Sequence, residues 1–256
     1  MAVSTVPTLQ LEREIAARGY DVIVGFDEVG RGSLAGPVMV GAAAIRTADL
    51  DGPGALDVPE GVADSKMLTE HRRETIFESL KSWSASWAVG ASSNAEIDEW
   101  GISYALGVAA LRALDEVERE LGIADDGRPI RVGAILDGPN DYITKALGTF
   151  DAPDVPVPAT VTTKVKGDRY CATVATAAVI AKVTRDRLII IDAINNRMPS
   201  HGVLRPYKTS AADSAAGIPC NTLPSTVLYH NLVNHAPFIY KGDAQLLRPR
   251  AVPLRL

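Results

Sequence analysis

The chain has 256 residues, of which 46% are hydrophobic, and a formal net charge of −5 at pH 7. These values fit a globular protein with one large domain, or a domain with an appendage, and disfavour a non-specific nucleic-acid coat. No apolar run reaches the ~20 residues that span a bilayer, and the two cysteines make no disulfide framework. The first residues lack a signal-peptide pattern, so we expect a cytoplasmic protein that does not associate with membranes.

Apolar periodicity predicts an alternation of strands and helices along the chain. Strands are expected at five apolar runs, 22–27, 38–45, 86–92, 131–137 and 159–165. Helices are expected at 9–18, 69–83, 102–121 and 170–197, with a further short helix after a capping box of Ser93 and Glu96. The short connection between the first two strands favours antiparallel pairing, because a parallel crossover needs a dozen or more residues. This order predicts a mixed α/β sheet.

The stretch Val22–Pro37 reads VIVGFDEVGRGSLAGP and joins an apolar run to two adjacent acids, Asp27 and Glu28. Successive side chains of a strand point to opposite faces, so these acids converge only if the strand breaks between them. We expect the three glycines that follow to supply that break. Acids beside loop amides and Arg31 indicate a metal next to a phosphate. The alternative is an acidic turn that uses glycines for tight geometry.

Two further acids occupy similar positions: Asp137 ends the fourth expected strand, and Asp168 precedes the last helix. A two-metal phosphodiesterase site holds its cations about 4 Å apart with several carboxylates. Hard oxygen ligands select magnesium or manganese over zinc. The candidate ligands for up to two Mg²⁺ or Mn²⁺ ions are therefore Asp27, Glu28, Asp137 and Asp168.

Basic residues gather in two parts of the chain in spite of its negative net charge. They are Lys164, Lys166, Arg169, Lys182, Arg185 and Arg187 in the first part, and Lys241, Arg248, Arg250 and Arg255 in the second. A basic surface beside acidic metal ligands fits a phosphodiester substrate, and solvated helix faces are the alternative. Asp186 lies one helical turn from Lys182, and we expect the two to form a salt bridge.

Four blocks of the sequence, in this order, resemble the ribonuclease HII family, the type 2 ribonucleases H. The first is Gly25–Pro37, GFDEVGRGSLAGP, whose thirteen residues make the match specific. The others are Asp64-Ser65-Lys66, then Ile135-Leu136-Asp137-Gly138, and finally Lys166-Gly167-Asp168 with Ile180–Asp186. The resemblance covers roughly residues 20 to 200.

The resemblance implies a ribonuclease H-like fold, with a five-stranded mixed sheet flanked by helices and a C-terminal extension. It implies hydrolysis of RNA in RNA–DNA hybrids and of ribonucleotides embedded in DNA. We expect a monomer with a catalytic domain at 1–197 and a substrate-binding or extension segment at 198–256. The four acids match the family's metal ligands. The residues expected to contact nucleic acid are Gly30, Arg31, Gly32, Ser65, Lys66, Lys166 and Tyr207.

The chain departs from the family around Tyr207, which matches a tyrosine that packs on deoxyribose in a Lys-Gly-Tyr context. Here Arg205 and Pro206 replace the lysine and the glycine. Ala212 stands where a histidine commonly follows, and Ala178 replaces a serine of the fourth block. These changes leave the four acids in place. They affect the part of the family pattern that recognises junctions with a single ribonucleotide.

Two other functions remain open at the level of the sequence. One is a catalytically weak protein that kept the fold and binds hybrids, which the altered region after residue 197 suggests. The other is a nuclease of the same fold that acts on DNA junctions. The complete set of four acids weighs against the binding protein. Comparing the cleavage of hybrid and all-DNA duplexes would distinguish the junction nuclease from a ribonuclease H.

Overall fold

The computed structural model describes residues 6–33, 36–123, 129–149, 152–195 and 239–240. Its centre is a mixed sheet with the strand order β5-β4-β1-β2-β3-β6. The strands are β1 (Val22–Val29), β2 (Val38–Arg46), β3 (Ser86–Ser92), β4 (Val132–Asp137), β5 (Thr160–Lys164) and the two-residue β6 (Ile239–Tyr240). Among the described residues, no helix has both the length and the apolar character needed to cross a bilayer.

The pairing of the strands follows the lengths of the connections between them. β1 pairs antiparallel with β2, and β2 with β3. β4 lies parallel to β1, and β5 parallel to β4. The chain between β3 and β4 holds two helices, which is enough for a parallel crossover. The expected antiparallel pairing of the first two strands is therefore confirmed.

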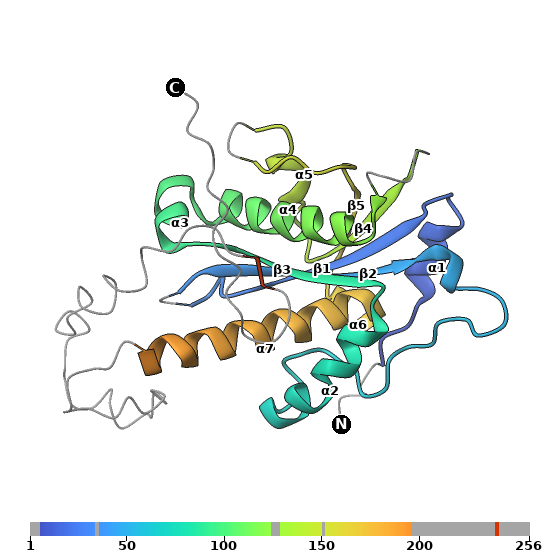
Figure 1. Cartoon of the computed structure of the whole chain (residues 1–256), viewed down its shortest axis with the longest axis horizontal. Helices are drawn as coiled ribbons and strands as arrows, with labels where there is room; N and C mark the ends of the chain where they lie inside the picture. The colour runs from blue at the N-terminus through green and yellow to red at the C-terminus, as the bar shows by residue number, and fades with distance from the viewer. Residues whose placement is uncertain (1–5, 34–35, 124–128, 150–151, 196–238, 241–256) are drawn as a thin grey trace.

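Helices cover both faces of the sheet (Figure 1). On one face lie α3 (Asn94–Trp100), α4 (Ile102–Glu120) and α5 (Ile143–Ala146). On the other lie α2 (Glu70–Trp83), α6 (Gly167–Tyr170) and the long α7 (Ala172–Asn195), with α1 (Gln10–Ala16) at one end. Residues of β1 alternate between these layers: Val22, Val24 and Phe26 join the core under α4, and Ile23 joins the core under α1 and α7.

Glycines in the strands allow the long helices to lie very close to the sheet. A Cβ built on Gly25 or Gly41 would lie 2.3 Å from the Thr173 carbonyl carbon or 2.4 Å from the Ala177 oxygen of α7. A Cβ on Gly90 would lie 2.0 Å from the Ala109 oxygen of α4. Real side chains never approach so closely, so these three positions set the spacing of the layers.

One expectation about the first strand is wrong. β1 does not break between Asp27 and Glu28 but continues to Val29, because its ladder with β2 pairs Asp27 with Gly41 and Glu28 with Val40. The two acids therefore lie on opposite faces of an unbroken strand. The glycines begin only after the strand has ended.

The expected helix 170–197 is divided into two by Cys171, which has an extended backbone between α6 and α7. The cause is a contact with the N-terminal segment: Thr8 donates its amide to the Tyr170 carbonyl and accepts a bond from the Ala172 amide. Tyr207 and the segment 198–256, apart from β6, lie outside the described residues, so the domain boundary stays a prediction.

Candidate active site

The sheet places Asp27 and Asp137 side by side. β1 and β4 run parallel with Phe26 opposite Leu136, so the next residue of each strand is an acid. Phe26 and Leu136 both belong to the core under α4. By alternation, Asp27 and Asp137 therefore face the other layer, where α6 and α7 lie. Two acids that are 110 residues apart in the sequence thus share one edge of the sheet.

A tight turn after β5 brings Asp168 to the same edge. Lys166 has left-handed backbone angles, φ 59° and ψ 40°, a conformation that costs a non-glycine residue roughly 1–2 kcal/mol. This turn directs the amide of Gly167 onto Asp137, whose Oδ1 accepts the hydrogen bond at 2.6 Å. α6 starts at this point, and Asp168 is its second residue.

The electrostatics of these acids reflect their crowding. Burial, together with the nearby charges of Asp137, Glu28 and Asp168, raises the pKa of Asp27 well above its usual range. Burial and the neighbouring Asp64 and Asp137 raise the pKa of Asp168 to about 6. Lys66 opposes both shifts. A buried group of like charges with one nearby cation is the environment that a bound divalent cation would stabilise.

Glu28 approaches this edge from the opposite face of β1, and two donors hold its carboxylate. Arg31 Nη1 donates to Oε1 at 3.2 Å, and the Tyr142 hydroxyl donates to Oε2 at 3.2 Å. Tyr142 is buried in the core under α4, between β4 and α5. Burial and the charges of Glu28 and Asp27 raise the pKa of Tyr142 well above 10, so its hydroxyl remains a donor.

A fifth acid, Asp64, joins the group from the segment before α2. Its Oδ1 accepts the Lys66 amide at 2.9 Å, and its Oδ2 accepts Arg169 Nε at 3.0 Å. Burial acts to raise the pKa of Asp64, but bonds from Lys66, Asp168 and Arg169 outweigh it and leave the pKa below its ordinary value. The second motif is thereby tied to α6. Ser65 is buried beside it.

The glycine loop after β1 rests on α7. Gly30 has φ +94°, and a Cβ there would lie 2.6 Å from Arg185 Nε and 2.8 Å from the Pro37 oxygen. Arg185 is buried and donates from Nε to the Pro37 carbonyl at 3.2 Å. Gly32 has open space around it. The loop is therefore fixed at both ends and accessible at Gly32.

The donor set fits Mg²⁺ or Mn²⁺, because it consists of carboxylate oxygens, buried at Asp27 and Asp168 and half-buried at Glu28 and Asp137. Among the described residues, no three His, Cys, Asp or Glu side chains close on one point as they stand. Each acid has other partners in this structure. Asp137 bonds the Gly167 amide, Asp168 bonds Asp64, and Glu28 bonds Arg31 and Tyr142. A bound cation would compete with these donors for the same oxygens.

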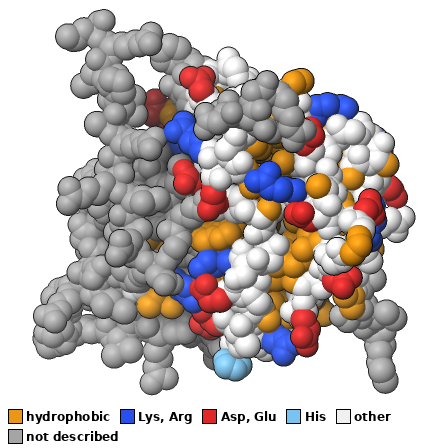
Figure 2. All heavy atoms as spheres, turned by 45° about the vertical axis from the view of Figure 1, so that its right-hand side comes forward, with side chains coloured by type: hydrophobic (Ala, Val, Ile, Leu, Met, Phe, Trp, Pro, Cys, Tyr) orange, Lys and Arg blue, Asp and Glu red, His pale blue; other side chains and the backbone are white. Residues whose placement is uncertain are grey.

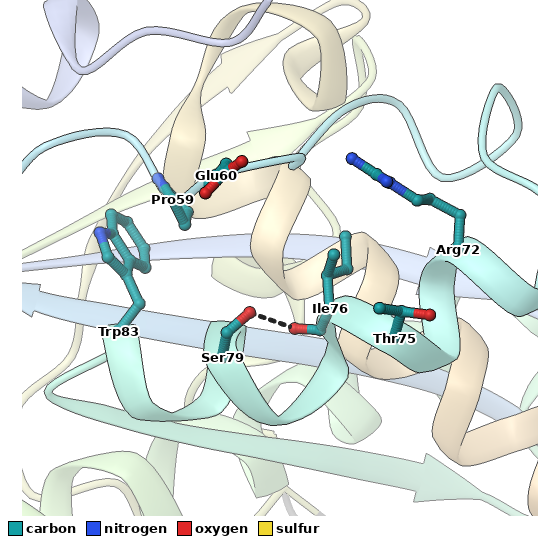
Figure 3. A pocket seen from close by; sticks show the side chains of 7 residues that line it. All are labelled: Pro59, Glu60, Arg72, Thr75, Ile76, Ser79 and Trp83. Carbon is teal, nitrogen blue, oxygen red and sulfur yellow. Dashed lines mark hydrogen bonds between the residues drawn. The ribbon is translucent and has the colours of Figure 1, made fainter.

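A surface pocket of about 420 Å³ lies elsewhere, between the loop at Pro59 and α2 (Figure 3). Its lining includes none of the four acids, and Glu60 and Arg72 are its charged members. Ser79 is already bonded to the Ile76 carbonyl at 2.7 Å. Because it contains none of the four acids, the pocket is not the candidate active site.

Charged side chains of both signs are interspersed over the described part of the face drawn in Figure 2. The predicted salt bridge between Lys182 and Asp186 is present, and Arg73 also approaches Asp186, at 3.9 Å. Part of the expected basic surface is thus neutralised within the protein. Lys66, Lys164, Lys166 and Arg169 lie around the acids.

Two residues of the site carried no assigned role at the level of the sequence, Asp64 and Tyr142. Asp64 stands directly before the Ser65-Lys66 pair, and its acidic character next to a predicted substrate motif was an available signal. Tyr142 lies in a stretch that sequence patterns predict to be irregular, and no pattern marks it. Tyr207, in contrast, lies outside the described residues, so its role stays a prediction.

Comparison with known proteins identifies related sequences. Residues 24–202 match the sequence profile of the family described as Ribonuclease HII. A ribonuclease HII from Streptomyces avermitilis is 43% identical over 72% of this chain and 66% of its own length. One from Streptomyces griseus is 43% identical over 72% of this chain and 65% of its own. The chain thus covers slightly less than two thirds of these relatives.

A solved structure supports the fold. The ribonuclease H2 from Pyrococcus horikoshii OT3 is 26% identical and aligns with a TM-score of 0.50, over 72% of this chain and 82% of that chain. The expected ribonuclease H-like fold is confirmed by this likeness and by the mixed sheet with helices on both faces. The family profile matches most of the chain, including all four acids. This chain therefore belongs to the ribonuclease HII family.

Proposed function

We propose that this protein is a metal-dependent endonuclease that hydrolyses the RNA strand of RNA–DNA hybrids and ribonucleotides embedded in DNA. The observation that carries the proposal is the meeting of Asp27, Asp137 and Asp168 at one sheet edge, next to the glycine loop. These acids come from three separate segments of a chain that belongs to the ribonuclease HII family. An acidic surface patch formed by chance would not be buried in this way.

In the proposed mechanism, Asp27, Glu28, Asp137 and Asp168 hold up to two Mg²⁺ or Mn²⁺ ions. When bound, such ions supply the charge that activates a water for in-line attack and stabilises the departing 3′ oxygen. The carboxylates fix the position of the attacked phosphate relative to the loop. The products would carry 5′-phosphate and 3′-hydroxyl ends.

Recognition of RNA is assigned to the glycine loop. The 2′-hydroxyl distinguishes RNA from DNA, and a backbone without side chains can approach it closely. Gly32 is open to such an approach, and Arg31 lies beside it with an exposed side chain. Arg31 is paired with Glu28 in this structure, so binding a phosphate would require Arg31 to exchange that partner. Lys66 and Lys166 are proposed to contact the nucleic-acid backbone.

The test is a cleavage assay on three duplexes: an RNA–DNA hybrid, a DNA duplex with one ribonucleotide, and all-DNA. We expect cleavage of the first two in Mg²⁺ or Mn²⁺ and none in EDTA. Asp137→Asn should remove at least about 99% of the rate, since metal ligation supplies several kcal/mol. Asp98→Asn, on the exposed surface of α3, serves as the matched control and should keep full activity.

Three outcomes would contradict the proposal. Wild-type-like turnover by Asp137→Asn would remove the metal site from the mechanism. Hybrid binding in EDTA with little product even in Mn²⁺ would favour the binding protein. Cleavage of all-DNA as fast as the hybrid would favour a junction nuclease. A monomeric state and a cytoplasmic location stay predictions from the sequence.

A further inference from the structure

Exposed apolar side chains gather around the candidate active site. Three of the six large apolar side chains exposed in the described part of the chain are Met67, Val165 and Tyr170, with exposures of 64%, 58% and 45%. Each lies within two residues of a proposed site residue: Lys66, Lys166 or Asp168. Exposed apolar side chains that occur together often mark an interaction site, whereas single ones are common on any protein surface.

The same segments carry basic side chains. Lys66, Lys164, Lys166 and Arg169 alternate with the three apolar residues along 66–67 and 164–170. We call this set of seven side chains the apolar–basic rim. Lys164 Nζ lies 5.4 Å from the centre of the Tyr170 ring, so a cation and an aromatic face are presented together.

Two contacts fix the parts of the rim relative to one another. The ion pair between Arg169 and Asp64, with 3.0 Å between Nε and Oδ2, joins α6 to the segment that holds Lys66 and Met67. The Tyr170 carbonyl accepts the Thr8 amide at 2.9 Å, which fixes the backbone below the ring. The rim is therefore held in place by the fold, although all its side chains except Lys164 and Arg169, which are half-buried, are exposed.

We propose that the apolar–basic rim binds the sugar–phosphate backbone of the nucleic-acid substrate beyond the scissile phosphate, with the Tyr170 ring against a sugar and Lys164 at a phosphate. The inference rests on the proposed function. Its basis is chemical complementarity, since a duplex backbone alternates apolar sugar faces with anionic phosphates, and the rim alternates apolar and cationic groups. Most protein contacts to nucleic acid are made to phosphate and sugar.

The test is the affinity for a fluorescent RNA–DNA hybrid, measured by anisotropy in Ca²⁺ at several salt concentrations. Tyr170→Ala should weaken binding severalfold, because the apolar contact between the ring and the sugar is lost, with an unchanged salt slope. Tyr170→Phe should keep wild-type affinity, because the ring makes the contact. Lys164→Gln should lower the slope of log K against log salt by about one unit.

Tyr20→Ala is the matched control, because Tyr20 also carries a cation over its ring, with Arg131 at 4.3 Å, but lies away from the rim. We expect Tyr20→Ala to bind like wild type. Equal affinities for Tyr170→Ala, Lys164→Gln and wild type would overturn the inference, as would an equal loss in Tyr20→Ala. Cleavage of the hybrid by the wild-type protein is measured separately. If the wild type cleaves the hybrid but these variants bind it normally, the inference about the rim is wrong while the proposed function stands.

Discussion

Asp137 accepts a hydrogen bond of 2.6 Å from the backbone amide of Gly167, the residue directly before Asp168. This bond ties the end of β4 to the start of α6, so two of the proposed ligands are positioned by one backbone donor. The left-handed turn at Lys166 directs the donor. The site is thus built on the backbone, and side-chain changes within it should alter charge more than shape.

Asp27→Asn should abolish hydrolysis and at the same time stabilise the protein. Burial and three nearby acids raise the pKa of Asp27 well above its usual range, so its ionised form destabilises the folded state. An amide of the same shape carries no such charge. Unfolding by urea in EDTA at pH 8 should show a higher free energy of unfolding than wild type, with the exposed Asp98→Asn unchanged. A less stable Asp27→Asn would contradict this account of the site.

Tyr142→Phe should weaken the binding of Mn²⁺ by about 10-fold, the usual effect of removing an outer hydrogen bond to a metal ligand. Without the hydroxyl, Glu28 loses the donor on Oε2, and Arg31 alone orients it. Calorimetric titration of the protein without nucleic acid measures this. Tyr104→Phe is the control, since its hydroxyl bonds Thr149 and not an acid. If both variants lose Mn²⁺ affinity to a similar extent, the effect would come from altered packing and not from the positioning of Glu28.

Glu12→Ala should destabilise the fold by roughly 1–3 kcal/mol, because it leaves buried donors without a partner. The Oε1 atom of Glu12 accepts both the amide and the hydroxyl of Thr173, at 3.0 and 2.9 Å, in the first turn of α7. Glu14→Ala, on the exposed side of α1, the helix that carries Glu12, should change stability little. Urea unfolding at pH 7 compares the two. Glu12→Gln keeps an acceptor and should recover most of the loss.

Glu118→Gln should flatten the dependence of stability on pH. Burial raises the pKa of Glu118 to about 7, against an ordinary 4.5, and the Val157 amide is its hydrogen-bond donor. The folded state therefore binds this proton more tightly than the unfolded chain, so the stability contribution is present below pH 4.5 and is lost as pH rises through 7.

Between pH 4 and pH 9, wild type should lose up to about 3 kcal/mol relative to Glu118→Gln, at 1.36 kcal/mol per pKa unit. Parallel urea-unfolding series at four pH values measure the difference. Parallel pH profiles for the two proteins would mean that folding leaves the pKa of Glu118 unchanged, and would contradict this prediction.

Gly41→Ala should destabilise the fold by at least about 2 kcal/mol, since the added methyl group has no free space. Its Cβ would lie 2.4 Å from the Ala177 oxygen and 2.9 Å from the Ala181 Cβ, both on α7. Gly32→Ala is the control for stability, because nothing lies within 4 Å of its Cβ. Equal melting temperatures would mean that α7 can shift away from the sheet.

The sequence by itself predicted most of the strands and helices and pointed to four acids as candidate metal ligands. Apolar periodicity is a local property, so the strand at 86–92 and the capping box at Ser93 are found where expected. Asp27 and Asp137 were recognisable because each abuts an apolar run. The specific thirteen-residue block predicted the family, which the comparisons confirm.

The tertiary structure decided how those residues meet, because pairing between distant segments leaves no local pattern. The ladder with β2 carries β1 past Asp27 and Glu28 and places them on opposite faces. The contact of Thr8 with Tyr170 divides the last helix in two, just after the turn that presents Asp168. Asp64 joins the site because the chain folds it against Arg169. These contacts join segments that are far apart in the sequence. They form only when the whole chain folds, so no local sequence pattern predicts them.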